Sequence, residues 1–156
     1  MRTITLALVG LVLAGCQSKA PQPTVAERAR FFLESADGRG QVVTLPQSGS
    51  RITVVPKAIL TEFDVVNVTI AHVELGDCLV FHFTPAASRD LDRLTAANLG
   101  RRLVLVLGGI AFGARRISHA MDHGTLFTYV EVPDEALPAL AASLNETAAA
   151  LHPPSK

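Results

Sequence analysis

The sequence predicts an α+β fold, in which a mostly antiparallel sheet carries two amphipathic helices packed on one face. Short runs rich in β-branched and aromatic residues alternate with Gly, Pro and Asp, which is typical of strands joined as hairpins. Two longer segments, one after Pro85 and one after Pro133, place apolar residues at helical spacing. The length of 156 residues and the hydrophobic content of 49% fit one domain preceded by a targeting segment.

The amino-terminal residues are predicted to be that targeting segment. Arg2 gives a positive start, residues 4–13 are apolar, and Leu13-Ala14-Gly15-Cys16 follows directly. Because this run is shorter than the roughly 20 residues of a membrane-spanning helix, residues 1–15 are predicted to be a signal peptide. The Leu-Ala-Gly-Cys ending resembles the lipobox of bacterial lipoproteins, which implies cleavage before Cys16 and acylation of its thiol and new amine. The alternative is an ordinary secreted protein with a free Cys16.

The resemblance to a lipoprotein also implies a location. Several acyl chains hold a protein stably on a bilayer, since each buried CH₂ contributes about 0.8 kcal/mol. We therefore expect palmitate on Cys16 and a membrane-anchored domain that faces the periplasm. Gln17 at the second mature position, rather than Asp, resembles an outer-membrane sorting signal if the source has two membranes. Residues 16–28, with Pro21 and Pro23, are expected to form the lipidated cysteine and its tether.

The charge balance argues against a nucleic-acid partner. Lys and Arg number 14, as do Asp and Glu, so the formal net charge is zero, whereas nucleic-acid binding needs clustered positive charge. The basic pairs at 101–102 and 115–116 are predicted to be solvated strand ends. With Cys16 acylated, Cys78 has no disulfide partner. We expect Cys78 to be a small, half-buried apolar residue.

The predicted domain covers residues 29–151, with 152–156 as a tail, and its first element has two interpretations. Thr24 and Glu27 fit a capping box and favour a helix through Ser35. The apolar run 31–33 before a turn at 37–38 and a second run at 41–45 instead favours a hairpin, with a strand at 29–35. We favour the strand. A further strand is predicted at 51–55 and is closed by Pro56, with a turn or a single helical turn at 58–64.

The middle of the chain predicts a hairpin, a helix and a buried strand. Residues 66–70 and 79–83 alternate in polarity around the turn at 76–77. The following helix carries Leu91, Leu94 and Ala97 on one side and ends at Asn98 and Gly100. The unbroken apolar run at 103–107 is predicted to be a strand covered on both faces.

The last part of the chain predicts two further strands and a helix. The glycines at 108–109 favour a tight turn into a strand at 110–112. Residues 113–124 are predicted to be irregular, and residues 125–132 alternate like an edge or half-buried strand. Pro133 is expected to open the final helix, which ends before Pro153. Four leucines at helical spacing are its expected core side, namely Leu137, Leu140, Leu144 and Leu151.

Few residues suggest chemistry. His119 and His123 have the spacing of two metal ligands on a helix, but their segment does not predict a helix and no third ligand is evident. His72 and His82 are expected on the surface of a sheet. Nothing in the sequence assembles a nucleophile, a base and oxyanion donors. We therefore expect no enzyme activity, no metal and no cofactor.

Residues along most of the predicted domain resemble a known family. The similarity is to the head subdomain of the first periplasmic domain of SecD, an accessory subunit of the bacterial Sec protein-export machinery. It spans about residues 29–147 and includes the segment 56–65, where a Leu-Thr pair precedes an Asp. The other residues that carry it are Thr95, Asn98, Gly100, Arg101, Leu103 to Leu107, Gly109, Ile117, Gly124 and Asp134-Glu135-Ala136.

This resemblance implies a function as well as a fold, because the SecD head is thought to contact emerging polypeptides. By resemblance, a partner-binding loop would involve Gly108, Gly109, Ala114 and Arg115. The chain departs from the family at this loop, since the family commonly has Asp-Gly at 108–109 and a proline after the residue matching Ala114. SecD couples to the proton gradient through membrane helices, and no stretch after Cys16 is long and apolar enough to be one.

The expectation is therefore a non-enzymatic, lipid-anchored envelope protein that binds unfolded polypeptide or a Sec or other envelope partner. Two alternatives stay open. The domain would be a structural lipoprotein that docks to one fixed folded partner, or a metal-dependent hydrolase that uses His119.

Overall fold

The computed structural model describes residues 28–153. The predicted signal peptide, Cys16, the tether up to residue 27 and the Thr24–Glu27 capping box lie outside the described residues. In chain order the elements are β1 (Ala29–Glu34), β2 (Gln41–Thr44), β3 (Arg51–Leu60), η1 (Glu62–Asp64), β4 (Val65–Val73), β5 (Gly76–Phe83), α1 (Pro85–Ala97), β6 (Arg102–Leu107), β7 (Ile110–Arg116), β8 (Thr125–Thr128), η2 (Asp134–Ala136) and α2 (Leu137–Leu151).

The strands form two antiparallel sheets, where the sequence predicts one. The five-stranded sheet has the order β2-β3-β1-β6-β7 and the three-stranded sheet has the order β4-β5-β8. The chain passes from one sheet to the other at η1, where Thr61 N and Oγ1 donate to Asp64 Oδ2 at 2.8 and 3.0 Å. This capping box fixes a sharp turn between β3 and β4, so the expected helical turn after residue 58 is present at Glu62–Asp64.

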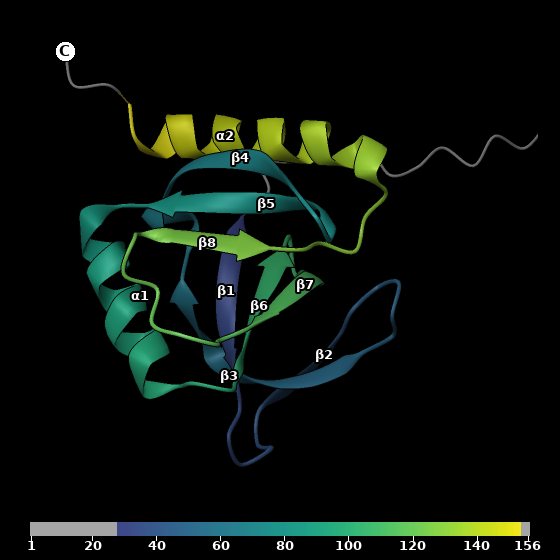
Figure 1. Ribbon diagram of the computed structural model, residues 1–156, viewed down its shortest axis with the longest axis vertical. Coiled ribbons are helices and arrows are strands. Elements are labelled where there is room, and N and C mark those ends of the chain that lie inside the picture. Colours follow the sequence, from purple (N-terminus) through teal and green to yellow (C-terminus); the bar gives the residue numbers. More distant parts are fainter. Residues whose placement is uncertain (1–27, 154–156) are drawn as a thin grey trace, which may run out of the picture.

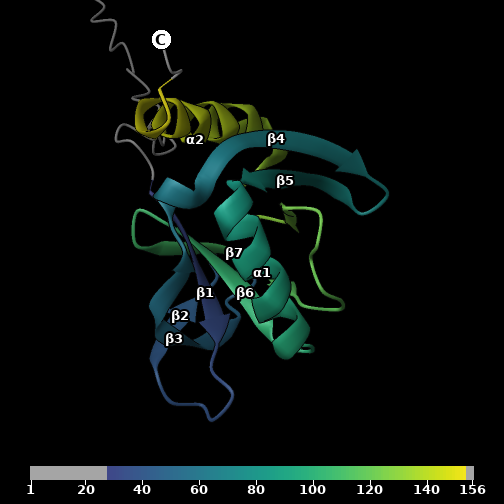
Figure 2. The same cartoon turned by 90° about the vertical axis from the view of Figure 1, so that its left-hand side faces the viewer.

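The helices cover different parts of the molecule. In Figure 1, α2 lies along the top beside β4, whereas α1 lies at the left and runs in a different direction. Figure 2 shows α2 nearly end-on above β4, and the β4–β5 hairpin projecting away from the rest of the fold. The α+β class is confirmed, but the packing of both helices on one face is not, because α1 and α2 lie at different parts of the molecule and run in different directions (Figures 1 and 2).

The main core lies between the sheets and the helices. Phe31 of β1 is fully buried, and its ring meets Phe81 and Phe83 of β5 edge-on at centroid distances of 5.0 and 5.9 Å. Helix α1 adds Leu91 and helix α2 adds Leu140, together with its neighbouring leucines. Each such side chain, when fully buried, contributes roughly 1.5–3 kcal/mol.

Both faces of β6 are covered, as the sequence predicts. Leu103, Leu105 and Leu107 belong to the main core. On the opposite face, Val104 is fully buried and Val106 is half-buried in a second, smaller cluster. The second face is covered because the β2–β3 hairpin curls over it, so β2 approaches β7 across the sheet.

Several local predictions are also confirmed. Residues 29–34 form a strand, not the alternative helix. Helix α1 begins where expected because Thr84 Oγ1 accepts from Ala87 N at 3.3 Å and Pro85 occupies the first turn. It ends at Asn98, followed by Gly100 at φ 84°.

The predicted end of the strand at 51–55 before Pro56 is wrong, because β3 continues to Leu60. The ladder between β1 and β3 shifts register here: Glu34 pairs with Val54, and Phe32 pairs with Ala58. Pro56 falls between these pairs, so its missing N–H interrupts no regular hydrogen bond.

The boundaries after residue 110 also differ from the prediction. Strand β7 extends to Arg116, so Ala114 and Arg115 belong to a strand and not to an irregular segment. Strand β8 ends at Thr128, because the chain then leaves β5 and runs beside β7, where Glu131 N donates to Phe112 O at 2.7 Å. Helix α2 begins at Leu137, after a 3₁₀ turn that Pro133 precedes.

Candidate binding groove

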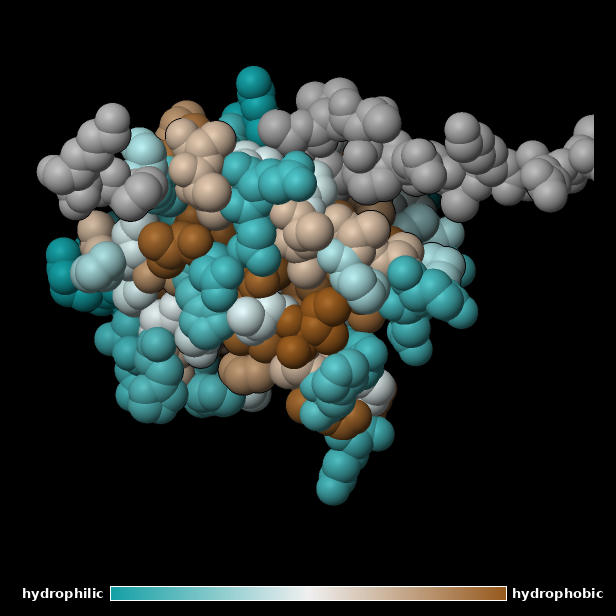
Figure 3. Space-filling view, turned by 90° about the horizontal axis from the view of Figure 1, so that it is seen from above, coloured by the Kyte–Doolittle hydropathy of each residue, from teal (hydrophilic) through white to brown (hydrophobic). Residues whose placement is uncertain are grey.

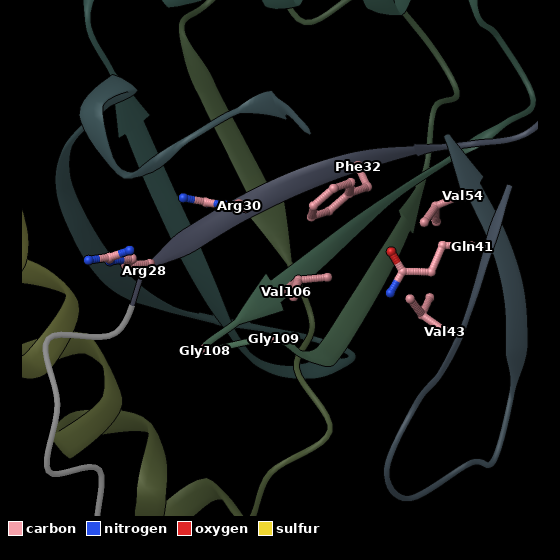
Figure 4. A pocket seen from close by; sticks show the side chains of 9 residues that line it. All are labelled: Arg28, Arg30, Phe32, Gln41, Val43, Val54, Val106, Gly108 and Gly109. Carbon is pink, nitrogen blue, oxygen red and sulfur yellow. The ribbon is translucent and has the colours of Figure 1, made fainter. Parts of the chain in front are cut away.

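The curled β2–β3 hairpin leaves an open groove on the second face of the five-stranded sheet. We call this cavity the outer groove; its volume is about 420 Å³, within the range of ordinary ligand pockets. Figure 4 shows β2 on one side of it and the β6–β7 turn on the other. It is lined by Arg28, Arg30, Phe32, Gln41, Val43, Val54, Val106, Gly108 and Gly109.

The walls and floor of the outer groove are mainly apolar. Phe32 and Val106 project from β1 and β6, and Val43 and Val54 from β2 and β3 (Figure 4). Val54 is 1% exposed, whereas Phe32, Val43 and Val106 are half-buried and so present accessible apolar surface. An apolar segment that enters the groove would remove this surface from water.

One end of the outer groove is positively charged. Arg30 Nε and Nη2 donate to the two carboxylate oxygens of Glu62 at 3.1 and 3.3 Å. Arg28 Nε lies 3.8 Å from Glu62 Oε1, and the Arg28 side chain is 72% exposed. The hydrogen bond from Arg30 holds the pKa of Glu62 below its usual range, so this carboxylate stays charged. Two guanidinium groups face one carboxylate, which leaves a net positive charge.

The free edge of β2 borders the same groove. Strand β2 forms a ladder only with β3, from Gln41↔Val54 to Thr44↔Arg51, and lies at the end of its sheet. The backbone groups on an edge strand that point away from its partner can pair with another strand. An extended chain lying in the groove could therefore continue the sheet from β2.

Both outer edges of the three-stranded sheet are blocked by side chains. On β4, Asn145 of α2 accepts from Val68 N at 2.7 Å and donates to Val68 O at 2.8 Å. On β8, Arg115 Nη1 donates to Phe127 O at 2.9 Å, and its guanidinium lies 5.8 Å from the centre of the Phe127 ring. Protected edges of this kind discourage strand addition, which distinguishes them from β2.

The structure separates the residues of the expected partner-binding loop. Gly108 and Gly109 form the β6–β7 turn at φ 56° and 93° and line the outer groove. Ala114 packs against the smaller apolar cluster inside the curl. Arg115 lies farther along β7 and contacts β8. Only the two glycines therefore line the groove, and partner binding by the four residues stays a prediction.

The histidines and the cysteine do not assemble into a site. His119 and His123 lie in the segment between β7 and β8, which forms no helix. Among residues 28–153, no group of three or more His, Cys, Asp or Glu side chains could hold a metal ion. His72 Nδ1 lies 2.6 Å from Asp77 Oδ1 on the surface of the hairpin. Cys78 is 1% exposed, more deeply buried than expected, and burial raises the pKa of its thiol.

Sequence patterns did not reveal most of the groove. The alternation in β1 places Phe32 opposite the buried Phe31, but local pattern does not say whether the second face is covered. The curl depends on contacts between residues distant in sequence, such as β2 with β7. The paired glycines at 108–109 are the one sequence signal that points to a part of the groove, the β6–β7 turn.

Comparison with solved structures identifies the fold. SecDF, described as a membrane component that enhances protein export, matches with a TM-score of 0.60 and 18% identity, over 76% of this chain and 62% of that one. SecDF in a super-membrane-facing form matches with a TM-score of 0.61 and 18% identity, over 77% of this chain and 19% of that chain. The present chain thus spans less than two thirds of either structure.

A third structure agrees with these two. SecDF from Thermus thermophilus, described as a translocon-associated membrane protein, matches with a TM-score of 0.52 and 18% identity, over 79% of this chain and 20% of that chain. Neither a protein-family model nor a curated protein matches the sequence. The likeness therefore shows a SecD-like fold and confirms that part of the resemblance. Among the described helices, none has the length and apolar character of a membrane span.

Proposed function

We propose that this protein is a non-enzymatic, lipid-anchored module of the bacterial envelope that holds extended polypeptide in its outer groove. The observation that carries the proposal is the position of the free β2 edge beside an apolar groove of about 420 Å³. Extended peptides commonly bind by adding a strand to a sheet edge, with neighbouring pockets taking alternate side chains. The SecD-like fold supports this role, since SecDF is described as enhancing protein export.

The lining of the groove supports binding without catalysis. Its residues are arginine, phenylalanine, glutamine, valine and glycine, so no side chain that lines it is a nucleophile with a general base beside it. Apolar contacts and backbone hydrogen bonds favour many sequences equally. The positive end at Arg28 would favour segments that carry a carboxylate beside their apolar residues.

Binding of unfolded polypeptides to residues 17–156, followed by fluorescence anisotropy, tests the proposal. Val43→Asp places a charge in the wall of the groove and is expected to weaken binding at least tenfold. Val66→Asp is the matched control, because Val66 is 44% exposed on β4, away from the groove. Absence of binding by the unaltered protein at high micromolar concentration, or equal losses in both variants, would contradict the proposal.

The anchor has its own test. Radiolabelled palmitate should enter the full-length protein in cells, and Cys16→Ser should abolish its incorporation. If Cys16→Ser still incorporates the label, palmitate is attached to a residue other than Cys16. Release of the unaltered protein into the soluble fraction would support the ordinary secreted protein instead.

A second function, docking to one fixed folded partner, is favoured by a separate apolar patch. Leu75 at the tip of the β4–β5 hairpin is 85% exposed. It lines a second, shallow pocket together with Val73, Phe127 and Tyr129, which are 38–42% exposed. Figure 3 shows the face that carries α2 as a mixture of apolar and polar areas. Crosslinking in intact envelopes separates the two functions: many polypeptide products support groove binding, whereas one dominant product that Leu75→Asp removes supports docking.

A further inference from the structure

The tip of the β2–β3 hairpin is held by a single carboxylate from a distant part of the chain. Glu131 Oε2 accepts from Gln47 N at 2.8 Å and from Ser48 N at 2.9 Å, across more than 80 positions in sequence. Two backbone N–H groups that donate to one charged oxygen make stronger hydrogen bonds than neutral pairs do. The tip itself is exposed, so few other contacts fix it.

The backbone of Glu131 is in turn fixed to the five-stranded sheet. Glu131 N donates to Phe112 O of β7 at 2.7 Å. The approach of this segment is possible because Gly113 has no side chain: a Cβ there would lie 2.1 Å from Tyr129 O. Glu131 therefore joins the hairpin tip to the β7 edge and closes the curl that forms the groove.

Apart from Glu131, the hairpin is held on that side mainly by apolar packing. Leu45 at the tip and Ile52 and Val54 of β3 belong to the small apolar cluster. On β2, Val43 packs against this cluster, and Gln41 and Val43 face the groove. At its base, Gly40 adopts φ 142°, and a Cβ there would lie 2.1 Å from Val54 O. The chain thus enters β2 at a glycine-dependent bend, about which the β2 end of the hairpin could move away from β6 and β7 if its tip were released.

We propose that Glu131 is a positioning residue for the outer groove, a latch that holds the β2–β3 hairpin near β7 and thereby sets the width of the groove. This inference rests on the proposed function where it concerns polypeptide binding. Release of the latch widens the groove, so polypeptide enters and leaves faster. The bonds to Gln47 and Ser48 and the charge of Glu131 act together, so a neutral amide of the same shape holds the hairpin less well than the carboxylate does.

Amide hydrogen exchange of the full-length chain in detergent micelles tests the latch directly. Glu131→Ala should make the amides of Gln47 and Ser48 exchange about tenfold faster or more, and those of residues 41–44 severalfold faster, with little change in the main core. Glu131→Gln should give an intermediate increase. Glu135→Gln is the control, because Glu135 is exposed and near in sequence but outside the groove and the hairpin contact.

Stopped-flow binding of a labelled unfolded polypeptide gives the second readout. The association and dissociation rates should both rise in Glu131→Ala, by about threefold or more, with a smaller change in Kd. Unchanged exchange at Gln47 and Ser48 would overturn the latch, and so would faster exchange with unchanged binding rates. If the unaltered protein binds no polypeptide, the proposed function fails, and the exchange at residues 41–44 alone decides whether Glu131 positions the hairpin.

Discussion

The Glu34 side chain ties the end of β1 to the start of β6. Its Oε2 accepts from Arg102 N at 2.9 Å and from Arg102 Nε at 3.0 Å. The Glu34 carbonyl accepts from Arg101 Nε at 2.8 Å. The sequence predicts both arginines to be solvated. In the structure each is half-buried and hydrogen-bonded to Glu34. These charge-assisted bonds join adjacent strands where the ladder ends.

Removal of the Glu34 carboxylate should therefore destabilise the protein. Glu34→Ala is expected to lower the free energy of unfolding by about 1–3 kcal/mol, the usual loss when a hydrogen-bonded charged group is deleted. Urea unfolding at pH 7 measures it. Asp90→Ala is the control, since Asp90 pairs with Arg93 on the exposed face of α1 and such pairs contribute about 0–1 kcal/mol. Equal losses in both variants would contradict this account of Glu34.

The same carboxylate gives this prediction a pH dependence. The hydrogen bond from Arg102 lowers the pKa of Glu34, and this effect outweighs its partial burial. A lowered pKa in the folded state means that the stabilisation is present above the ordinary Glu pKa of about 4.3 and is lost as the pH falls through the folded value. The stability difference between the unaltered protein and Glu34→Gln should be constant at neutral pH and shrink below about pH 4. A difference that grows in acid would contradict it.

At the scale of elements, α2 protects the edge of β4. Asn145 makes the two hydrogen bonds to Val68 that a neighbouring strand would otherwise make. Its position on a helix whose buried side is formed by leucines and alanines was not marked by any periodic signal. One polar side chain thus replaces part of a strand.

Asn145→Ala should expose that edge. We expect a loss of about 1–3 kcal/mol, because Val68 N and O lose their partners, and self-association through β4 at high concentration. Urea unfolding and analytical ultracentrifugation measure the two effects. Asn145→Asp keeps an acceptor for Val68 N but sets a carboxylate oxygen against Val68 O, which repels it, so its loss should be at least as large. If Asn145→Ala is monomeric and as stable as the unaltered protein, the Asn145 hydrogen bonds do not protect the β4 edge.

The effect of Gly113→Ala on stability depends on how closely residues 129–131 pack against β7. Its backbone is not at positive φ, so Gly→Ala would ordinarily stabilise by about 0.4–1 kcal/mol through the unfolded state. The 2.1 Å approach of an added Cβ to Tyr129 O reverses this expectation. Gly113→Ala should destabilise by more than about 1 kcal/mol in thermal or urea unfolding and increase exchange at Gln47 and Ser48. A stabilised variant would mean that residues 129–131 do not lie against β7.

At the scale of the whole molecule, local signals predicted elements but not the way the sheets divide and curl. Thr84-Pro85 and Gly100 bound α1 by capping physics that acts within a few residues, so that prediction is confirmed. The prediction at Pro56 was wrong because the irregular β1–β3 ladder accommodates a proline within the strand. The predicted end of β8 was wrong because residues after Thr128 hydrogen-bond to β7 instead of β5. The outer groove escaped prediction for the same reason, since its walls come from strands far apart in sequence.

The Phe31 side chain joins the two sheets through its ring contacts. It lies on β1, in the middle of the five-stranded sheet, yet its ring packs on Phe81 and Phe83 of the three-stranded sheet. Phe31→Ala should lower the free energy of unfolding by about 3–5 kcal/mol, the usual cost of deleting a buried aromatic ring. Phe63→Ala is the control, because Phe63 is 62% exposed and should change stability by less than about 0.5 kcal/mol.

The form of the unfolding transition carries the stronger test. If the interface at Phe31 couples the sheets, the unaltered protein unfolds in one transition when circular dichroism and hydrogen exchange in each sheet are followed together. In Phe31→Leu, which keeps an apolar side chain but loses the ring contacts, the amides of β4 and β8 should become exchangeable at lower denaturant than those of β1 and β6. Two separate transitions in the unaltered protein would show that each sheet is stable alone, and that the main core is not shared between them.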